Sequence, residues 1–532
     1  MQPEPWWRGA VIYQIYPRSF FDTDGDGIGD LRGAAEKLDY VASLGVDGVW
    51  LSPFFRSPMK DFGYDVSDYC DFDPIFGSLA DFDALLARAH ALGLKVIIDQ
   101  VYSHTSDEHP WFEESANARD GPKADWYVWA EPKDDGTAPN NWLSVFGGPA
   151  WTWGPRRRQY YLHNFLAGQP DLNFHNPAVQ AAILQVATFW LDRGVDGFRL
   201  DVANYYFHEA SLKDNPPQNC ATAPSWPYAY QRHLYDRSQP QTLTFLARLR
   251  ALTDKYPERM MVGEIGDSDP LARQQEYTAG CDRLHTAYSF HLLDGGRGSP
   301  QLFAQALSAW RGADGWPSWS LGNHDFARFA TRLGGPNAGP DQINALLAAH
   351  FCMRGTIFVY QGDELGLPQA HVPFDQMQDP FAKRAFTGDS GRDGARTPFP
   401  WTAAAPMGGF STAGDAWLPV DPRHLPLAAE VQAKDPGSHL AVTRRLIALR
   451  AAHRALRTGE ADLLDAGENI LALVRAEKSE RILCVINLGG QPGSFSHKEL
   501  AGATTLDTGL RGRLTGAQVD FPAYGGGFFA LP

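Results

Sequence analysis

The sequence predicts an α/β protein built on a parallel (β/α)8 barrel. Short apolar runs alternate along most of the chain with amphipathic segments, and this alternation is typical of parallel strands that are each followed by a helix. Eight such units can be counted. Because 532 residues exceed what one hydrophobic core usually holds, roughly 100 to 200 residues per domain, we expect further domains on this barrel.

The eight strands are predicted from short apolar runs, and most are followed by segments with apolar residues three and four positions apart. The predicted strands span residues 11–16, 48–51, 96–101, 197–200, 261–264, 285–290, 318–321 and 356–360. The clearest predicted helices span residues 79–92, 177–191, 243–252, 302–310 and 343–351.

Two connections are too long for barrel loops, which usually contain only a few residues. The connection after strand three, residues 103–176, is rich in Trp, Pro and Gly and is predicted to be an inserted subdomain. The connection after strand four, about residues 203–240, is predicted to be a folded excursion over the same rim. Alternating runs with Gly-rich turns predict a C-terminal antiparallel β-sandwich domain at residues 456–532, which leaves residues 1–102 and 177–455 for the barrel.

Composition and charge limit the function classes. Hydrophobic residues make up 44% and charged residues 20% of the chain, so it can bury a large core and is not disordered. The formal net charge of −15 argues against a nucleic-acid partner, because phosphate contacts need Lys and Arg. The run of three arginines at residues 156–158 is therefore interpreted as a solvated face. An acidic chain rich in aromatic residues favours a neutral polar ligand.

The cysteines and the N-terminal segment indicate the compartment. The five cysteines form no close pair, so we expect reduced, mostly buried thiols rather than a disulfide framework or a zinc site. The N-terminal segment lacks a basic region followed by an apolar run, and no stretch of about 18 apolar residues occurs. We therefore expect a cytoplasmic protein without a membrane partner, either a monomer or a homodimer.

Carboxylates lie at the ends of several predicted strands, where a barrel of this kind places its functional side chains. Asp99, Asp201, Glu264 and Asp325 belong to strands three, four, five and seven, and Asp65 lies in the loop after strand two. One such carboxylate could simply cap the next helix, but several on one rim share no structural task. Neighbouring carboxylates push their pKa values apart, which leaves one ionised and one protonated, as the cleavage of a glycosidic bond requires.

Arg199 lies two residues before Asp201 and therefore faces the same way on an extended strand. At the barrel mouth its guanidinium can hold the Asp201 carboxylate ionised and in position. Glu264 instead follows an apolar strand, which favours its protonated form. The two carboxylates are thus predicted to differ in pKa.

The strand-end carboxylates belong to four short motifs: DQVYSH at residues 99–104, FRLD at residues 198–201, Glu264 after Val262 and Gly263, and NHD at residues 323–325. These motifs resemble, in order, the four conserved regions of the α-amylase family, glycoside hydrolase family 13. The segment QPDLN at residues 169–173 is similar to an extra region of its oligo-1,6-glucosidase and α-glucosidase branch. Ser103 stands where the family usually has Asn, which argues against a second calcium site. The similarity extends over nearly the whole chain, including residues 7–20 and 391–398.

The resemblance implies a function for individual residues. Asp201 is the expected nucleophile, Glu264 the expected acid/base, and Asp325 the carboxylate that binds substrate hydroxyls and stabilises the oxocarbenium-like transition state. Asp65 and Arg392 resemble the pair that closes the pocket behind the non-reducing glucose in exo-acting members. The other expected substrate-binding residues are Tyr64, His104, Phe146, Phe165, Arg199 and His324.

The loop after strand one, DTDGDGIGD at residues 22–30, has the spacing of a cation site. It places Asp22, Asp24, Asp26 and Asp30 at positions 1, 3, 5 and 9 of an EF-hand-like loop, with the Ile28 carbonyl at position 7. The usual Glu at position 12 is absent, and a solvated turn is the alternative interpretation. The resemblance implies one structural Ca²⁺ or Mg²⁺ in this loop, and no organic cofactor is expected.

The leading hypothesis is an exo-acting retaining α-glucosidase that removes glucose from maltose-like substrates, with transfer to alcohols as an additional activity. The alternatives within the family are an α-1,6-specific oligoglucosidase, a sucrose-cleaving or isomerising enzyme, and a trehalose-forming enzyme. A non-catalytic ectodomain of an amino-acid transporter is disfavoured, because such proteins lack part of the carboxylate set and follow a membrane span.

Two signals disagree about the preferred linkage. Val202 resembles the residue found in α-1,6-acting members, whereas the excursion resembles that of bacterial α-glucosidases that prefer short α-1,4 substrates. A folded excursion can shape the whole acceptor site, while one buried methyl group shifts discrimination by only about 1 to 3 kcal/mol. We therefore expect maltose to be preferred over isomaltose.

Overall fold

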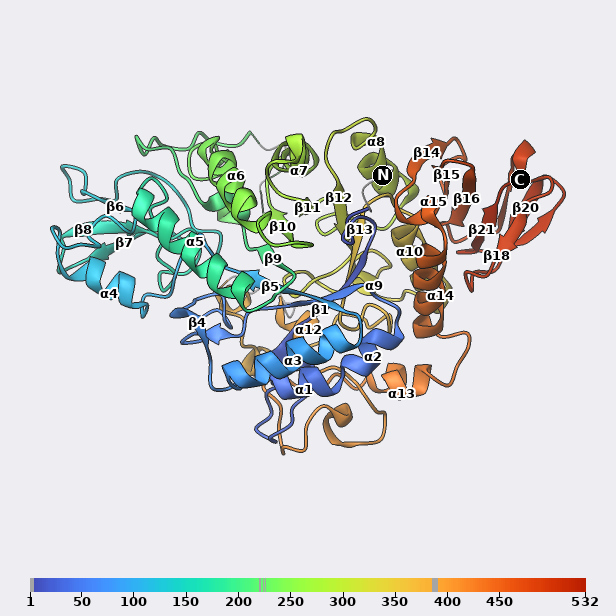
Figure 1. The fold of residues 1–532 in the computed structure, drawn as a ribbon, viewed down its shortest axis with the longest axis horizontal. Coiled ribbons are helices and arrows are strands. Elements are labelled where there is room, and N and C mark those ends of the chain that lie inside the picture. Colours follow the sequence, from blue (N-terminus) through green and yellow to red (C-terminus); the bar gives the residue numbers. More distant parts are fainter. Residues whose placement is uncertain (1–3, 220–221, 223, 225, 385–390) are drawn as a thin grey trace.

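Eight parallel strands close into a barrel in the computed structural model, which describes residues 4–219, 222, 224, 226–384 and 391–532 (Figure 1). The order around the ring is β1-β13-β12-β11-β10-β9-β5-β2, which confirms the predicted (β/α)8 fold. Each predicted strand agrees with the observed one to within one residue at either end. The bounds are β1 (Val11–Ile15), β2 (Gly48–Leu51), β5 (Lys95–Gln100), β9 (Gly197–Leu200), β10 (Met260–Ile265), β11 (Thr286–Ser289), β12 (Pro317–Ser320) and β13 (Thr356–Tyr360).

Side chains of the barrel strands alternate between the interior and the surrounding helices. Ile97 of β5 and Val262 of β10 belong to an apolar cluster inside the barrel, whereas Ile98 packs in the larger cluster on the outside. Because alternate residues of a strand share one face, the inward direction continues to Asp99 on β5 and to Glu264 on β10. This alternation brings polar side chains from different strands together at one end of the barrel.

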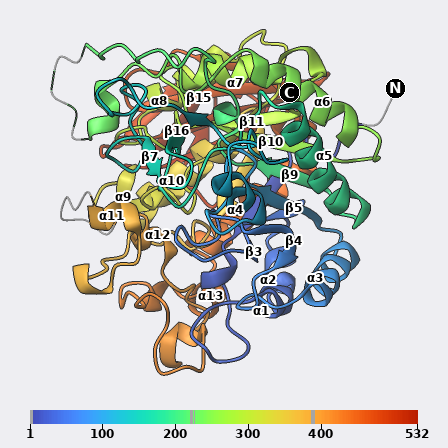
Figure 2. The same cartoon turned by 90° about the vertical axis from the view of Figure 1, so that its left-hand side faces the viewer.

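Helices cover the outside of the barrel, as Figures 1 and 2 show. Helix α3 (Leu79–Ala91) begins at a capping box between Ser78 and Asp81 and buries apolar side chains on one face. Helices α8 and α10 begin at Pro300 and Pro340, before the apolar pattern from which they were predicted, because proline is well suited to the first turn. Helix α8 spans Pro300–Ala309 and α10 spans Pro340–Phe351. The other helices in this layer are α1 (Leu31–Glu36), α2 (Leu38–Ser43), α5 (Pro177–Asp192), α6 (Gln241–Thr253), α7 (Pro270–Thr278) and α14 (His439–Ala452).

The connections on the rim carry shorter elements. Among the described residues, no helix combines the length and the apolar character that a membrane crossing requires. The shorter elements are β3 (Phe55–Arg56), β4 (Asp68–Phe72), α9 (Phe329–Arg332), α11 (Pro380–Arg384), α12 (Asp393–Arg396), α13 (Ala429–Gln432) and α15 (Arg454–Arg457).

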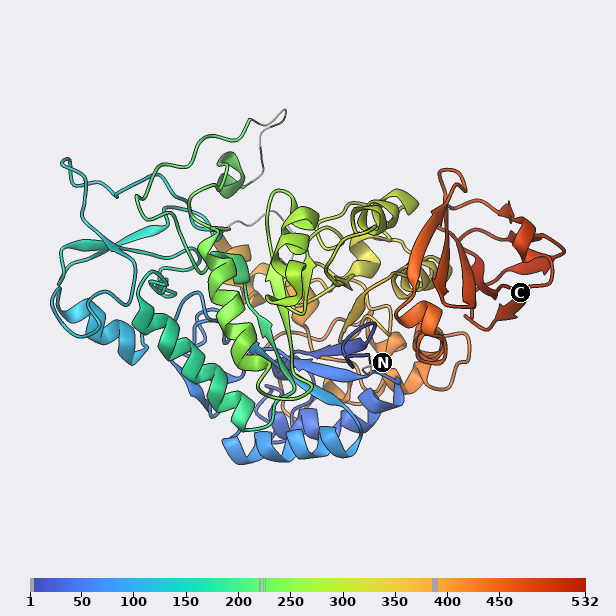
Figure 3. The same cartoon turned by 45° about the horizontal axis from the view of Figure 1, so that its top comes forward.

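The insertion after β5 contains α4 (Pro110–Asn117) and an antiparallel sheet of β6 (Trp129–Ala130), β8 (Gln159–Leu162) and β7 (Trp151–Gly154). The excursion that follows β9 packs on this insertion (Figure 3). Trp142 Nε1 donates a hydrogen bond to the Lys213 carbonyl at 2.8 Å, and Asn140 Nδ2 donates one to the Leu212 carbonyl at 3.1 Å. The two long connections therefore form one wall beside the barrel mouth.

The arginine run in the turn between β7 and β8 is not uniformly solvated. Arg156 and Arg158 are exposed, but Arg157 is buried. The Arg157 Nη1 donates to the Ser115 carbonyl at 2.7 Å, and its guanidinium lies 4.3 Å from the centre of the Trp129 ring. The interpretation as a solvated face is therefore wrong for Arg157, because the turn directs this side chain into the insertion.

The C-terminal strands form two antiparallel sheets that enclose their own apolar cluster, which includes Leu483, Val519 and Phe529. This arrangement confirms the predicted C-terminal antiparallel β domain. The first sheet consists of β14 (Glu460–Leu464), β15 (Ile470–Glu477), β16 (Glu480–Asn487), β21 (Gly526–Ala530) and β18 (Thr504–Leu506); the second consists of β17 (Gly493–Ser496), β20 (Gln518–Phe521) and β19 (Arg513–Thr515).

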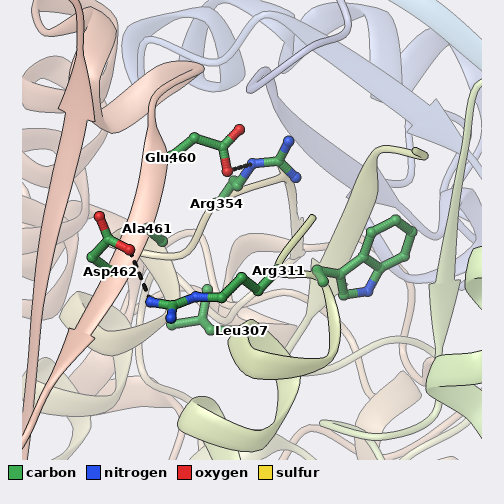
Figure 4. A pocket seen from close by; sticks show the side chains of 7 residues that line it. Leu307, Arg311, Arg354, Glu460, Ala461 and Asp462 are labelled. Carbon is green, nitrogen blue, oxygen red and sulfur yellow. Dashed lines mark hydrogen bonds and ion pairs between the residues drawn. The ribbon is translucent and has the colours of Figure 1, made fainter. Parts of the chain in front are cut away.

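Two ion pairs connect the barrel to the first strand of this domain (Figure 4). Arg354 Nε lies 3.0 Å from Glu460 Oε2, and Arg311 Nη2 lies 2.8 Å from Asp462 Oδ1. They flank a groove of about 410 Å³ between α8 and β14. Because the groove lies at this junction and away from the carboxylates of the barrel mouth, we regard it as part of the domain contact.

Of the four cysteines that the structure describes, two are buried. Cys352 and Cys484 are buried at the junction with the C-terminal domain, whereas Cys70 is partly buried and Cys281 is exposed. Cys220 lies outside the described residues.

Candidate active site

A cavity of about 500 Å³ opens at the C-terminal ends of the barrel strands. Asp201, Glu264 and Asp325 all line it. Asp201 directly follows β9, Glu264 lies near the end of β10, and Asp325 follows β12, so three different strands deliver the three carboxylates. The cavity is also lined by other residues expected from the sequence, namely Tyr64, His104, Phe146, Phe165 and Arg392.

A single buried guanidinium connects the carboxylates. Arg199 Nη1 lies 2.6 Å from Asp201 Oδ1 and 2.8 Å from Asp99 Oδ1. Arg199 Nη2 lies 2.6 Å from Glu264 Oε2. The predicted contact between Arg199 and Asp201 is therefore confirmed, but the same guanidinium also pairs with Glu264 and Asp99.

Burial raises the pKa values of the two central carboxyl groups, and Arg199 opposes this rise. Burial raises the pKa of Asp201 to about 7, with Arg199 lowering it and Asp99 and Asp325 raising it. Burial raises the pKa of Glu264 to about 8, and here too Arg199 opposes the effect of neighbouring carboxylates. Arg199 therefore favours the ionised form of both carboxyl groups, whereas burial favours the protonated form.

Asp325 has the opposite electrostatic environment. Arg396 Nη2 lies 2.8 Å and Arg392 Nη1 3.4 Å from Asp325 Oδ1, and His324 Nε2 lies 3.1 Å from Oδ2. Burial opposes ionisation, but the guanidinium groups of Arg396 and Arg392 hold the pKa of Asp325 below its ordinary value. Asp325 is therefore ionised near neutral pH.

The two histidines are neutral and form hydrogen bonds with the polar groups around the cavity. Burial lowers the pKa of His104 to about 4 and that of His324 well below its ordinary value. The Tyr64 ring stacks on His324 with the ring centres 5.1 Å apart, and its hydroxyl donates to Asp99 Oδ2 at 3.0 Å. His104 Nε2 lies 3.2 Å from Gln169 Nε2, which places the QPDLN segment at the cavity. A neutral imidazole can donate one hydrogen bond to an uncharged ligand and accept another from it.

Asp61, and not Asp65, forms the pair with Arg392. Arg392 Nη2 lies 2.7 Å from Asp61 Oδ1 and 2.8 Å from Asp379 Oδ1. The Asp65 carboxylate is fully buried within its own loop, where it accepts hydrogen bonds from Ser57 Oγ at 2.9 Å and from the Asp61 backbone N–H at 3.0 Å. The predicted Asp65–Arg392 pair is wrong, because Asp65 stabilises the loop that presents Asp61.

A further group of residues that line the cavity was not identified individually from the sequence. Arg237 of the excursion lies with its guanidinium 5.7 Å from the ring centres of both Tyr205 and Tyr228. All three residues line the cavity, as do Phe290 and Phe326, which follow β11 and β12. The only signal was the length of the excursion, because its residues follow no periodic pattern from which a direction can be inferred.

The DTDGDGIGD loop brings three aspartates together. Carboxylate oxygens of Asp22, Asp24 and Asp30 lie within 4.8 Å of one another. Asp26 lies outside this group, and its Oδ1 accepts a hydrogen bond from the Ile28 backbone N–H at 2.7 Å. Burial, and after it the neighbouring carboxylates, raise the pKa of Asp26 despite this bond. Closely spaced hard oxygen ligands of one charge fit Ca²⁺ or Mg²⁺.

The fold and the site together define the class of the protein, a glycosidase. Three carboxylates from separate strands meet in one cavity with neutral hydrogen-bonding and aromatic side chains, which suits the cleavage of a bond between uncharged sugars. The chain matches the model of the alpha amylase catalytic domain over residues 14–459. It belongs to the α-amylase family.

Individual relatives are similar over at least nine tenths of their length. A "probable alpha-glucosidase" of Rhizobium meliloti (strain 1021) is 49% identical, over 99% of this chain and 97% of that protein. An oligo-1,6-glucosidase of Parageobacillus thermoglucosidasius is 36% identical, over 92% of each. The solved structure of an alpha-glucosyl transfer enzyme, XgtA, is 48% identical with a TM-score of 0.95 and covers 100% of both chains.

Proposed function

We propose that this glycosidase is an exo-acting retaining α-glucosidase that releases terminal glucose from short α-glucosides. The observation that carries this proposal is a buried ion-pair network that lines the cavity, in which Arg392 bridges Asp61 and Asp379 at 2.7 and 2.8 Å beside Asp325. We expect this network to close the cavity behind one terminal sugar. The names of the similar α-glucosidase and oligo-1,6-glucosidase support an activity on small glucosides.

The proposed reaction proceeds by double displacement. Asp201 attacks the anomeric carbon while Glu264 protonates the leaving oxygen, and the bond to the aglycone breaks as a β-glucosyl ester forms on Asp201. Water, activated by the ionised Glu264, then displaces Asp201 and returns the proton to Glu264. The raised pKa of Glu264, about 8, supports its role as the acid near neutral pH. The ionised Asp325 stabilises positive charge at the sugar ring.

The acceptor side of the cavity supports glucosyl transfer as a second outcome. Tyr205, Tyr228, Phe290 and Phe326 provide ring surfaces there, with the Arg237 guanidinium among them. Such walls bind the apolar face of a sugar or another alcohol and exclude water, so a bound alcohol can replace water in the second displacement. The name of the similar alpha-glucosyl transfer enzyme agrees with this activity.

We expect the substrate order maltose above isomaltose, with activity decreasing from maltose to longer maltooligosaccharides. The excursion wall, held to the insertion by the Trp142 and Asn140 hydrogen bonds, limits the space beyond the first acceptor sugar. The test is a time course of products from maltose, isomaltose, sucrose, trehalose and soluble starch at equal concentrations. Hydrolysis of isomaltose faster than maltose would favour the α-1,6-specific oligoglucosidase. Isomerised sucrose would favour the sucrose-isomerising enzyme, and newly formed trehalose would favour the trehalose-forming enzyme.

We also propose that Asp22, Asp24 and Asp30 hold one structural Ca²⁺ or Mg²⁺ away from the cavity. A cation that binds only the folded state stabilises it by mass action, by about 2.7 kcal/mol at a hundredfold excess over Kd. Chelation should therefore lower the melting temperature, and the exposed Asp24→Asn variant should lose both the bound metal and the response to the chelator. Asp135→Asn, an exposed aspartate in another loop, serves as the control. Wild-type protein that contains no metal and does not respond to chelation or added cation would contradict the site.

The remaining expectations from the sequence are part of the same proposal. We propose a cytoplasmic enzyme that is active as a monomer or homodimer and needs neither an organic cofactor nor a nucleic-acid partner. The formal net charge of −15 supports the last point.

A further inference from the structure

The residue that follows Asp201 has an unusual backbone conformation. Val202 lies in the left-handed region, with φ 34° and ψ 52°. For a β-branched residue this conformation is a genuine outlier, and such strain persists only where the surrounding contacts fix it. The Val202 carbonyl accepts the Tyr205 N–H at 2.9 Å, and the preceding Asp201 N–H donates to the Gln100 carbonyl at 3.0 Å. The turn is therefore fixed on both sides.

This turn directs a backbone donor at Glu264. The Val202 N–H donates to Glu264 Oε2 at 3.2 Å, and Arg199 Nη2 lies 2.6 Å from the same oxygen. Among the residues that the structure describes, the contact of the other oxygen, Oε1, is a long one of 3.4 Å with the Tyr288 hydroxyl. One oxygen of this carboxyl group is thus occupied by two N–H donors, and the other is not.

We propose that the left-handed turn at Val202 positions the acid/base: its backbone N–H, together with Arg199, keeps Glu264 Oε2 unprotonated and leaves Oε1 as the oxygen that carries the transferable proton. Protonation of Oε2 would place a hydrogen against two donors, whereas Oε1 can accept the proton without that conflict. This inference rests on the proposed function of Glu264. It assigns a role to the main chain of Val202, which is separate from any effect of its side chain on linkage.

The direction in which the Val202 N–H shifts the pKa of Glu264 follows from its role as a hydrogen-bond donor. An N–H that bonds to a carboxylate favours the ionised form, so the Val202 amide lowers the pKa of Glu264 against the effect of burial. Removing the amide should raise this pKa and extend the acid form to higher pH. The ionisable groups that face Glu264 are Arg199, Asp201, Asp99, Asp325 and Tyr288.

The direct test replaces the Val202 amide by an ester, with the α-hydroxy analogue of valine incorporated at this position. The side chain is kept and only the N–H donor is lost. Since one unit of pKa corresponds to a hydrogen bond of ordinary strength to a charged group, we expect the basic limb of kcat/KM on maltose to move up by about one pH unit. A matched ester at Tyr205 removes the N–H that donates to the Val202 carbonyl and loosens the same turn. The basic limb of kcat/KM of this control variant should stay at the wild-type pH.

Two further measurements separate the possible outcomes. Val202→Gly retains the N–H, so its basic limb should also stay; a shift as large as that of the ester would assign the effect to the side chain and overturn the proposal.

In [¹⁵N]valine-labelled wild-type protein, the Val202 amide signal, assigned by its loss in Val202→Ala, should titrate with Glu264. It should no longer do so in Glu264→Gln. A Val202 signal that does not titrate, or an unshifted limb in the ester variant, would overturn the positioning role, whereas full activity of Glu264→Gln would instead refute the proposed function.

Discussion

Replacement of Asp201 by asparagine is expected to lower kcat on maltose by about 10⁴-fold or more. The amide oxygen is a poor nucleophile, and the neutral side chain no longer balances Arg199, which lies 2.6 Å from Asp201 Oδ1. The side chain keeps its size, so the melting temperature should change little compared with the loss of activity. Steady-state kinetics and thermal unfolding of the same preparation measure both quantities.

Azide rescue provides the control for this prediction. With a nitrophenyl α-glucoside, Asp201→Ala should react with azide directly and give the β-glucosyl azide, because only one inversion occurs. The matched Glu264→Ala variant retains the nucleophile and should give the α-glucosyl azide. The opposite assignment of the two products would show that the roles of Asp201 and Glu264 are exchanged.

Glu264→Gln is expected to lower kcat/KM on maltose by roughly 10²- to 10⁴-fold, the usual contribution of a general acid. On a nitrophenyl glucoside the loss of kcat/KM should be below about tenfold, because the activated leaving group needs little protonation. The pH profile should change as well. Burial raises the pKa of Glu264 to about 8, so the wild-type enzyme loses its acid above this pH, and the variant should lack this basic limb.

Equal losses on the two substrates would contradict the acid role of Glu264. Glu258→Gln is a suitable control, because Glu258 lies on the surface before β10, where its carboxylate forms an exposed ion pair with Lys95. Its kinetics should match the wild type on both substrates, since exposed ion pairs contribute little.

The barrel and its carboxylates could be predicted because strand periodicity alone determines where these side chains point. Arg199 and Asp201 are two residues apart on one strand, and they meet in the structure at 2.6 Å. Glu264 faces the same interior as Val262 for the same reason. The predicted bounds of strands such as β1 and β13 were accurate because each is a short, mostly apolar run buried on both faces.

Loop residues could not be assigned in this way. Asp61 and Asp65 lie in one connection, and the intervening residues Phe62 and Gly63 have φ values of 52° and 105°, so the chain there follows no repeating pattern. Which carboxylate faces Arg392 depends on the hydrogen bonds of the loop, which spacing does not reveal. In the DTDGDGIGD loop, Asp26 likewise bonds to the Ile28 N–H instead of joining the other aspartates, as short Asx turns often do.

The length of the connection after strand four correctly predicted a folded excursion, but it did not predict where the individual side chains lie. Its contacts with the insertion are made mainly to backbone carbonyls, such as those of Leu212 and Lys213. Such contacts leave no pattern in the sequence of the excursion. Tyr228 and Arg237 could therefore be placed at the cavity only from the structure.

The anomeric form of the first glucose released from maltose tests the central claim most directly. Two successive inversions at the anomeric carbon, the first by Asp201 and the second by water, restore the starting configuration. Time-resolved ¹H NMR at high enzyme concentration, before mutarotation, should therefore show α-glucose from the non-reducing end as the initial product. Initial release of this glucose as the β anomer would mean a single displacement and would contradict a covalent intermediate on Asp201.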